Sequence, residues 1–275
     1  MATEMQVEII SVGYELLIGR IPNTNAQFLA KRATMLGMKT TRVTVIADSV
    51  NEIANTILEA LQREPRVVII TGGLGPTFDD RTLEGMAKAL NRRLVVNAEA
   101  LSMVKEKYET YVQTKNDKPL ELTPPRIKMA TIPEKTEPIR NPVGTAPAVR
   151  ADVNKTAIFL LPGVPREMEA IFEETIAPLL NQASTGSAFY EDSIYVSEIM
   201  ESTIAPLIDR VMHRNSGVYI KSHPKGAENK PSIEIHFSIT AAETEKAKEK
   251  LQAAKDQLSR LITENSGKIN GVQSG

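Results

Sequence analysis

The first half of the chain alternates short β-branched runs with amphipathic segments. Runs at 7–13, 40–48 and 66–73 are apolar and rich in Val, Ile and Thr, as buried strands are. Residues 24–36, with Asn23 or Thr24 as the cap and Gly37 as the stop, and residues 50–64 have the periodicity of helices. Further helices are expected at about 81–90 and 98–113. This alternation is typical of a mostly parallel sheet with helices on both faces, an α/β fold.

The periodicity fails between 114 and 147, where prolines collect at 119, 124, 125, 133, 138, 142 and 147. We expect a loop-rich excursion with one short helix, because proline fixes φ and lacks an N–H group. Residues 148–163 then indicate a hairpin with Asn154 at its turn, followed by a helix over about 165–180. The first domain is placed at 1–180.

A small polar stretch, 181–189, has the composition of a linker. Beyond it we expect strands near 192–198, 217–222 and 232–240, helices over 202–213 and 241–263, and a frayed tail from 266. Alternate apolar positions from Ile233 to Ile239 indicate a half-buried strand. The second domain, 190–265, is therefore expected to be a small α+β unit.

Composition narrows the possible partners. The 275 residues carry a formal net charge of −1, which argues against nucleic acid as the main partner and for a small-molecule substrate. Cysteine is absent, which excludes disulfides and thiol nucleophiles. The first ten residues have neither the basic region nor the long apolar stretch that signal peptides have, and no later run approaches about 18 apolar residues. We expect a cytoplasmic protein with no membrane partner.

The segment TGGLGPTFDD, residues 71–80, follows a strand and precedes a helix. In open α/β sheets ligands bind beyond the carboxyl ends of strands. Gly72, Gly73 and Gly75 can adopt positive φ and leave backbone N–H groups accessible to a phosphate. A tight turn without a ligand is the plain alternative, but three glycines before a helix favour phosphate binding, with Thr77 in the same turn.

Asp79 and Asp80 end this segment. One of them could cap the next helix, but capping needs only one carboxylate. A second carboxylate beside a phosphate is tolerable when a divalent cation lies between them, and Mg²⁺ is typically held by one or two carboxylates plus phosphates. The pattern favours a metal site formed by Asp79 and Asp80.

Other candidates flank the same predicted strand ends. Glu15 is a third carboxylate or a solvated loop acid, and Asn23 and Asn25 could contact ribose or base or cap the next helix. Arg166 could clamp a phosphate at the start of a helix. The remaining candidates for substrate binding, in strand-flanking turns, are Gly144, Thr145 and Gly163. His213, His223 and His236 all fall in the second domain, away from these candidates.

The segments GYELLIGRIPNTNAQFLA, TGGLGPTFDD, NPVGTAPA and LPGVPREM together resemble the CinA family. The resemblance is to its N-terminal molybdopterin-binding-like domain, shared with MoaB and MogA, over about 6–180. Residues from about 190 to 263 resemble the family's KH-like domain, but lack a GxxG loop, so nucleic-acid binding is not expected. Tyr14 stands where the family usually has threonine. The chain ends before the family's deamidase domain could fit, so deamidase activity is not transferred.

The resemblance implies a three-layer α/β domain that binds a pyrophosphate-bearing or pterin-like ligand. It implies divalent-metal-dependent ADP-ribose pyrophosphatase activity, with Mg²⁺, Mn²⁺ or Co²⁺. Asp80 corresponds to an aspartate implicated in metal-assisted phosphate chemistry, with Asp79 beside it, and Glu15 could orient water. The alternatives are a molybdopterin-binding or adenylylating protein and a non-catalytic nucleotide-binding module. By analogy we expect a homo-oligomer, a dimer in preference to a trimer.

Overall fold

The computed structural model describes residues 5–115, 121–183, 186, 188–225 and 232–273. The chain divides into two compact units. The first comprises Met1–Thr34 and Met38–Ser184, and the second comprises Met35–Gly37 and Thr185–Gly275. Each unit has its own hydrophobic core and is described by itself.

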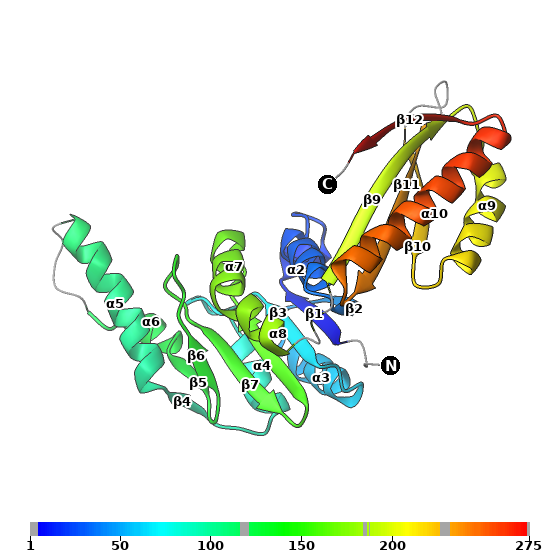
Figure 1. Ribbon diagram of the computed structural model, residues 1–275. Coiled ribbons are helices and arrows are strands. Elements are labelled where there is room, and N and C mark those ends of the chain that lie inside the picture. The colour runs from blue at the N-terminus through cyan, green and yellow to red at the C-terminus, as the bar shows by residue number, and fades with distance from the viewer. Residues whose placement is uncertain (1–4, 116–120, 184–185, 187, 226–231, 274–275) are drawn as a thin grey trace. The chain divides into compact units, whose positions relative to one another are not determined.

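A six-stranded sheet forms the centre of the first unit, in the order β2-β1-β3-β8-β7-β6 (Figure 1). The four strands from β2 to β8 are parallel, and β7 and β6 add two antiparallel strands. The strands span Gln6–Val12 (β1), Lys39–Ile46 (β2), Val67–Thr71 (β3), Glu137–Ile139 (β6), Ala148–Val153 (β7) and Thr156–Leu161 (β8). Asn154, at φ 53°, turns the chain from β7 to β8, which confirms the predicted hairpin.

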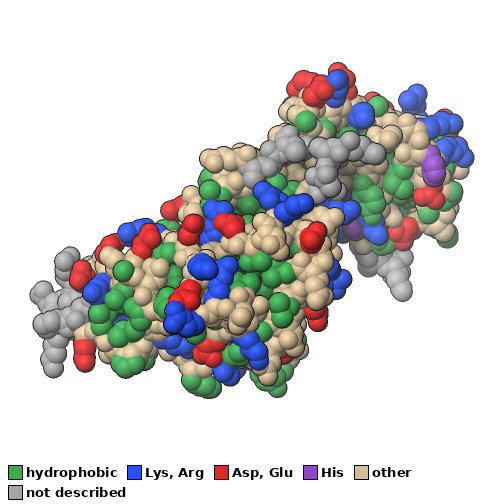
Figure 2. Space-filling view, turned by 90° about the horizontal axis from the view of Figure 1, so that it is seen from below, with side chains coloured by type: hydrophobic (Ala, Val, Ile, Leu, Met, Phe, Trp, Pro, Cys, Tyr) green, Lys and Arg blue, Asp and Glu red, His purple; other side chains and the backbone are tan. Residues whose placement is uncertain are grey.

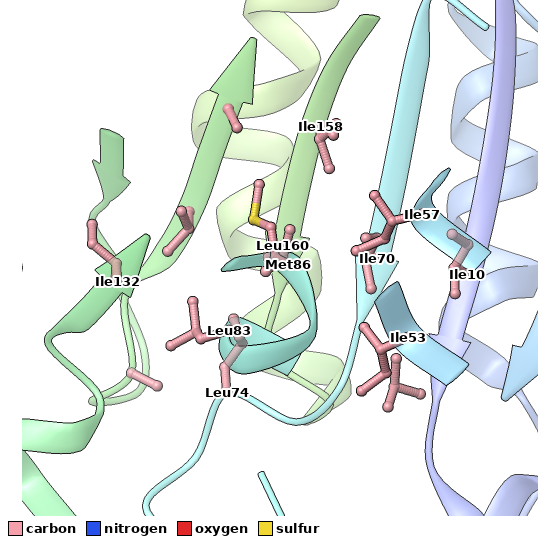
Figure 3. Close-up of a cluster of buried hydrophobic side chains, with 14 of the residues drawn as sticks. Ile10, Ile53, Ile57, Ile70, Leu74, Leu83, Met86, Ile132, Ile158 and Leu160 are labelled. Atoms are coloured by element: carbon pink, nitrogen blue, oxygen red, sulfur yellow. The ribbon is translucent and has the colours of Figure 1, made fainter. Parts of the chain in front are cut away.

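Helices cover both faces of this sheet. On one face, α3 (Val50–Gln62) and α4 (Thr82–Ala89) pack against β1, β3 and β8, and Figure 3 shows their side chains in one buried cluster. On the other, α2 (Thr24–Met35) lies beside the π-helical stretch Phe172–Ile176 that joins α7 (Pro165–Ile171) to α8 (Ala177–Ala183). The rings of Phe28 and Phe172 meet edge to face at 6.0 Å. The three-layer α/β prediction is confirmed.

The proline-rich excursion has more structure than the sequence indicated. After α5 (Ala98–Lys115), the short helix α6 (Pro124–Lys128) confirms one expectation. The strands β4 (Leu94–Val96) and β5 (Thr131–Pro133), which pair antiparallel, were not expected. Strands of three residues are too short to show an alternating pattern. Strand β4 precedes α5, and its pairing with β5 of the excursion accompanies a pocket that residues of α4, β4, α6 and β5 line together.

The second unit is an antiparallel sheet in the order β10-β11-β9-β12, with α9 (Glu201–Arg214) and α10 (Thr244–Glu264) packed on one face (Figure 1). Its strands are β9 (Ala188–Ser197), β10 (Tyr219–Lys225), β11 (Ser232–Ala241) and β12 (Lys268–Gln273). Alternate residues of β11 are buried against the helices, as predicted. The frayed tail is wrong, because Lys268–Gln273 pairs with β9. The unit is α+β as expected, and its likeness to a KH domain stays a prediction.

The charge of the protein is mixed in sign, with a formal net charge of −1. On the face shown in Figure 2, basic and acidic side chains are interspersed rather than separated by sign. Within the described ranges, no helix is long and apolar enough to cross a membrane.

Candidate functional site

The carboxyl ends of β1, β2, β3 and β8 meet at one edge of the sheet, because these strands are parallel. The segments that leave them include the predicted motifs at 13–25, 71–80 and 161–167. Four-residue α1 (Tyr14–Leu17) lies in the first of these segments. Many of the predicted site residues therefore gather at this edge, where eight of them line one or the other of two pockets.

Glycine is required in the glycine turn for two reasons, because its backbone has positive φ and because neighbouring atoms occupy the space of a Cβ. Gly72 and Gly73 have φ of 101° and 68°. A Cβ on Gly72 would lie 2.2 Å from the carbonyl oxygen of Val12, and one on Gly73 would lie 2.3 Å from Thr82 Oγ1. Fully buried Thr82 donates its hydroxyl to the Gly72 carbonyl at 2.7 Å, and its amide to the Gly73 carbonyl at 3.1 Å. Thr82 was not a candidate from the sequence.

Three successive residues of this turn, the buried Leu74 and its two glycine neighbours, have backbone amides that are not used within the turn. The Gly72 amide donates to Leu161 O at 3.0 Å. Over the part of the chain that the structure describes, the amides of Gly73, Leu74 and Gly75 have no hydrogen-bond acceptor. Helix α4 begins only at Thr82, so these amides, rather than the helix terminus, are the donors beside the turn.

Neither Asp79 nor Asp80 caps α4, whose N-cap is Arg81 with no side-chain hydrogen bond. Both carboxylates instead converge on Thr77. Its hydroxyl lies 2.5 Å from Asp80 Oδ2 and also bonds Asp79 Oδ1, and its amide donates to Asp80 Oδ2 at 2.8 Å. One hydroxyl proton cannot satisfy two carboxylates. The arrangement therefore leaves negative charge at an exposed position beside the open amides.

Electrostatics keep Asp79 ionised. The Thr77 hydroxyl, the residue's own amide and the charge of Lys128 lower the pKa of the Asp79 carboxyl, and the small loss of solvation opposes them only in part. Lys128 Nζ also donates to the Thr77 carbonyl oxygen. An ionised carboxylate at this position is the form that a divalent cation requires.

Asp48, which follows β2, was missed by the sequence reasoning. Its Oδ2 accepts the Tyr14 amide at 2.9 Å. Burial raises the pKa of the Asp48 carboxyl; the Tyr14 hydrogen bond opposes this shift, and the charges of Glu15 and Asp79 add to it. Candidates after β1 and β3 were selected because ligands bind beyond the carboxyl ends of parallel strands. The same reasoning applied to β2 would have selected Asp48. Across the described segments, no three His, Asp or Glu residues are arranged to hold a metal ion, so two carboxylates would need further oxygens from substrate or water.

A small pocket of about 80 Å³ lies where β1, β3 and β8 end. Five predicted residues line it: Glu15, Asn23, Asn25, Gly72 and Gly163. Asn23 Oδ1 accepts the Ala26 amide at 3.1 Å, which confirms its capping role in α2. Asn25 Nδ2 donates to Gly163 O at 2.8 Å, whereas its buried Oδ1 has no partner among the described residues.

A larger pocket, of about 330 Å³, lies beside the same turn and is lined by Gly73, Gly75 and Asp80. Its other walls come from α4, β4, α6 and β5, through Leu83, Glu84, Leu94, Pro124, Ile127, Lys128 and Thr131. None of these seven residues was a candidate from the sequence. The proline-rich segment gave no periodic signal that would place it beside the glycine turn.

The remaining candidates line neither pocket. The Gly144 amide already donates to Asn141 Oδ1 at 2.7 Å, and a Cβ on Gly144 would lie 2.0 Å from Glu167 Oε2. Asn141 Nδ2 donates to the same Glu167 oxygen at 2.7 Å, so the turn at 141–147 is held internally. Thr145 Oγ1 lies 3.8 Å from Met129 Sδ, and Arg166 is exposed. Ligand contacts by Gly144, Thr145 and Arg166 stay predictions.

Known proteins resemble this chain over both units. A family model described as "Probable molybdopterin binding domain" matches residues 8–182. A protein of Metallosphaera sedula is 42% identical over 268 residues, 97% of this chain and 98% of that protein. A protein of Pyrobaculum aerophilum is 44% identical over 268 residues, with the same coverage. The structure of "the protein CinA with unknown function" from Thermoplasma acidophilum is 40% identical, with a TM-score of 0.58, and covers 64% of this chain and 98% of its own.

Proposed function

We propose that the first unit of this chain, which belongs to the family of probable molybdopterin-binding domains, binds a phosphate-bearing nucleotide and hydrolyses its pyrophosphate with a divalent metal. ADP-ribose is the representative substrate. The observation that carries the proposal is the combination at one turn of three unbonded amides, Gly73 to Gly75, with two carboxylates, Asp79 and Asp80. Amides supply donors to phosphate oxygens, and carboxylates supply ligands to a cation that accompanies phosphate.

The residues present fit such a cation. Asp79 and Asp80 crowd one hydroxyl, and their mutual repulsion would be relieved by a bound positive charge. Mg²⁺, Mn²⁺ or Co²⁺ would supply polarisation of the phosphoryl group and of the attacking water. Glu15, in the adjacent small pocket, would orient that water. Water adds its oxygen to one phosphorus as the P–O–P bond breaks, so ADP-ribose and water give AMP and ribose 5-phosphate.

Molybdopterin binding or adenylylation is the second candidate, and the description of the matching family model favours it. It would use the same amides and carboxylates. The two reactions differ in product, because hydrolysis releases AMP from ADP-ribose, whereas adenylylation transfers AMP onto a pterin. Under either candidate, we further propose that the second unit is KH-like, that the protein is cytoplasmic and that it assembles into a homo-oligomer.

A screen of substrates against metals tests the reaction. The purified chain is incubated with ADP-ribose, FAD, NADH or a pterin with ATP, each with Mg²⁺, Mn²⁺ or Co²⁺, and the products are separated by chromatography. We expect AMP from ADP-ribose only when a metal is present. AMP found on the pterin would instead select the second candidate. If a nucleotide binds tightly but is not turned over with any of the three metals, the hydrolysis proposal is wrong and the protein is a non-catalytic nucleotide-binding module.

The substitution Asp80→Asn separates a metal ligand from a structural carboxylate. Asparagine keeps an oxygen that can accept the Thr77 amide, so thermal stability should change little. Loss of a hard anionic ligand should lower turnover of ADP-ribose by roughly a hundredfold, comparable to removal of one strong electrostatic contact in other active sites. Asp209→Asn, in exposed α9 sequence of the second unit, is the matched control and should retain full turnover. A variant whose activity falls only in proportion to its unfolded fraction would make Asp80 structural.

A further inference from the structure

The larger pocket beside the glycine turn has a mainly apolar lining. Four aliphatic or cyclic side chains from three elements contribute to it: Leu83 of α4, Leu94 of β4, and Pro124 and Ile127 of α6. Its volume of about 330 Å³ is at the lower end of small-molecule sites, which are roughly 300–1,000 Å³. The adjacent small pocket, at about 80 Å³, could take only a fragment of a ligand.

The polar groups of the larger pocket are acceptors more than donors. Asp80 and Glu84 place two carboxylates in the lining, against the single ammonium group of Lys128. That ammonium donates to the Thr77 carbonyl oxygen, and the Thr131 hydroxyl donates to Ile127 O at 2.9 Å. A phosphate inside would meet two like charges. Glu84 Oε2 already accepts from Arg81 at 3.1 Å and Asp80 Oδ2 from the Thr77 amide at 2.8 Å, which leaves the second oxygen of each carboxylate to accept from a ligand. A flat ring with apolar faces and N–H groups on its edge suits both features.

We propose that the larger pocket binds the fused heteroaromatic ring, purine or pterin, of the ligand whose phosphate lies at the glycine turn. The inference rests on the proposed function. Gly73 and Gly75 connect the two parts, because they line the pocket and carry amides that are unbonded within the described chain. The ring lies between the aliphatic side chains, and its exocyclic amine donates to Glu84 or Asp80. Asn23 and Asn25, in the small pocket, are then placed for a sugar or linker rather than for the ring.

The chain contains no tryptophan, so one introduced residue becomes an unambiguous fluorescent reporter. Leu94 lines the pocket, whereas neighbouring Val95 does not, and both are 37% exposed. Adjacent residues of a strand point to opposite faces, which makes Leu94→Trp the reporter and Val95→Trp its matched control. Each variant is titrated, as the full chain with metal, against AMP, ADP-ribose and a pterin monophosphate. Ribose 5-phosphate and inorganic pyrophosphate serve as ligands without a ring.

We expect the ring-bearing ligands to quench the emission of Leu94→Trp and to leave Val95→Trp unchanged. The ligands without a ring should quench neither variant. The ligand that quenches at the lower concentration identifies purine or pterin as the occupant.

A calorimetric titration of Ile127→Ala gives a second readout that needs no reporter. Removal of one aliphatic wall should weaken AMP or pterin binding by roughly tenfold, in the range measured for small changes in apolar pockets, and leave pyrophosphate binding within about twofold. Val95→Ala is the control for a substitution near the pocket, and a thermal melt verifies folding of each variant.

The outcomes separate this inference from the proposed function. If nucleotides bind the wild type but neither Leu94→Trp emission nor Ile127→Ala affinity changes, the ring lies elsewhere and the inference is wrong while the glycine site stands. Equal affinity for ligands with and without a ring also overturns it. If neither pyrophosphate nor any nucleotide or pterin binds the wild type, both the glycine site and the ring pocket are wrong.

Discussion

The ionised form of the Asp48 carboxyl is disfavoured in the folded protein by burial and by neighbouring negative charges. It is partly buried, accepts the Tyr14 amide and feels the charges of Glu15 and Asp79. Its pKa in the folded state is raised, so the contribution of Asp48 to stability is fully present below its unfolded pKa. That contribution is lost as the pH rises through the folded pKa. Near neutral pH, the ionised group therefore opposes folding.

The substitution Asp48→Asn should consequently raise the melting temperature near neutral pH, or leave it unchanged. Asparagine retains an oxygen for the Tyr14 amide and removes the repulsion from Glu15 and Asp79. The advantage over wild type should shrink as the pH falls, because the wild-type carboxyl becomes neutral. Thermal melts of both proteins across an acidic-to-neutral series check this. A variant that melts lower at every pH would show that the carboxylate has a favourable partner instead.

In the glycine turn at residues 71–80, the sequence predicted the backbone conformation better than it predicted the side-chain contacts. Three glycines indicated positive φ; Gly72 and Gly73 have it, whereas the prediction is wrong for Gly75. The sequence gave no indication that Thr82 would occupy the space left by the missing Cβ of Gly73. That contact depends on where α4 packs on the sheet, which is decided by side chains distant in sequence. Asp79 and Asp80 were placed at the correct edge, but their shared partner Thr77 could not be inferred from spacing.

At the scale of elements, the connection from β3 to α4 is closed by one buried hydroxyl. Thr82 Oγ1 donates to the carbonyl of buried Gly72. Thr82→Val keeps the size of the side chain and leaves that carbonyl without this donor, which should destabilise the fold by about 1–3 kcal/mol. Thr82→Ser keeps the donor and loses only a methyl group, at a cost of about 0.8 kcal/mol. Denaturant unfolding followed by circular dichroism compares them; equal stabilities for the Val and Ser variants would deny the hydroxyl this role.

Elements were predictable where their periodicity was long enough to be read. The strands from β1 to β3 and helices α2, α3 and α5 were expected near their observed bounds, since each repeats its pattern over several residues. The three-residue strands β4 and β5 were missed, and with them the larger pocket that they help to form. The sequence thus predicted the part of the candidate site that the segments after β1, β3 and β8 form. It did not predict the part formed by β4, α6 and β5, because their position beside the glycine turn is decided by tertiary packing.

At the scale of the whole molecule, the final strand completes the sheet of the second unit. The tail was expected to fray because chain termini are commonly poorly ordered. In the structure Ile269 instead pairs with Val196 across β12 and β9, and Gly267 fits closely against Ile199 and Ile262. Ile269 is 38% exposed, so the pairing of β12 with β9 and the close fit of Gly267, rather than local propensity, hold the strand.

Deletion of residues 267–275 should therefore destabilise the second unit while leaving the first unit intact. The deletion removes the antiparallel pairing of β12 with residues 193–197 of β9, and each lost backbone hydrogen bond costs about 0.5–1.5 kcal/mol net. Because the two units have separate cores, calorimetry should show one transition at a lower temperature, and nucleotide binding by the first unit should be retained. A chain shortened by Ser274 and Gly275 alone is the control and should melt as the wild type does. If the longer deletion also leaves every transition unchanged, the pairing of β12 with β9 contributes nothing to stability and the fraying expected from the sequence was correct.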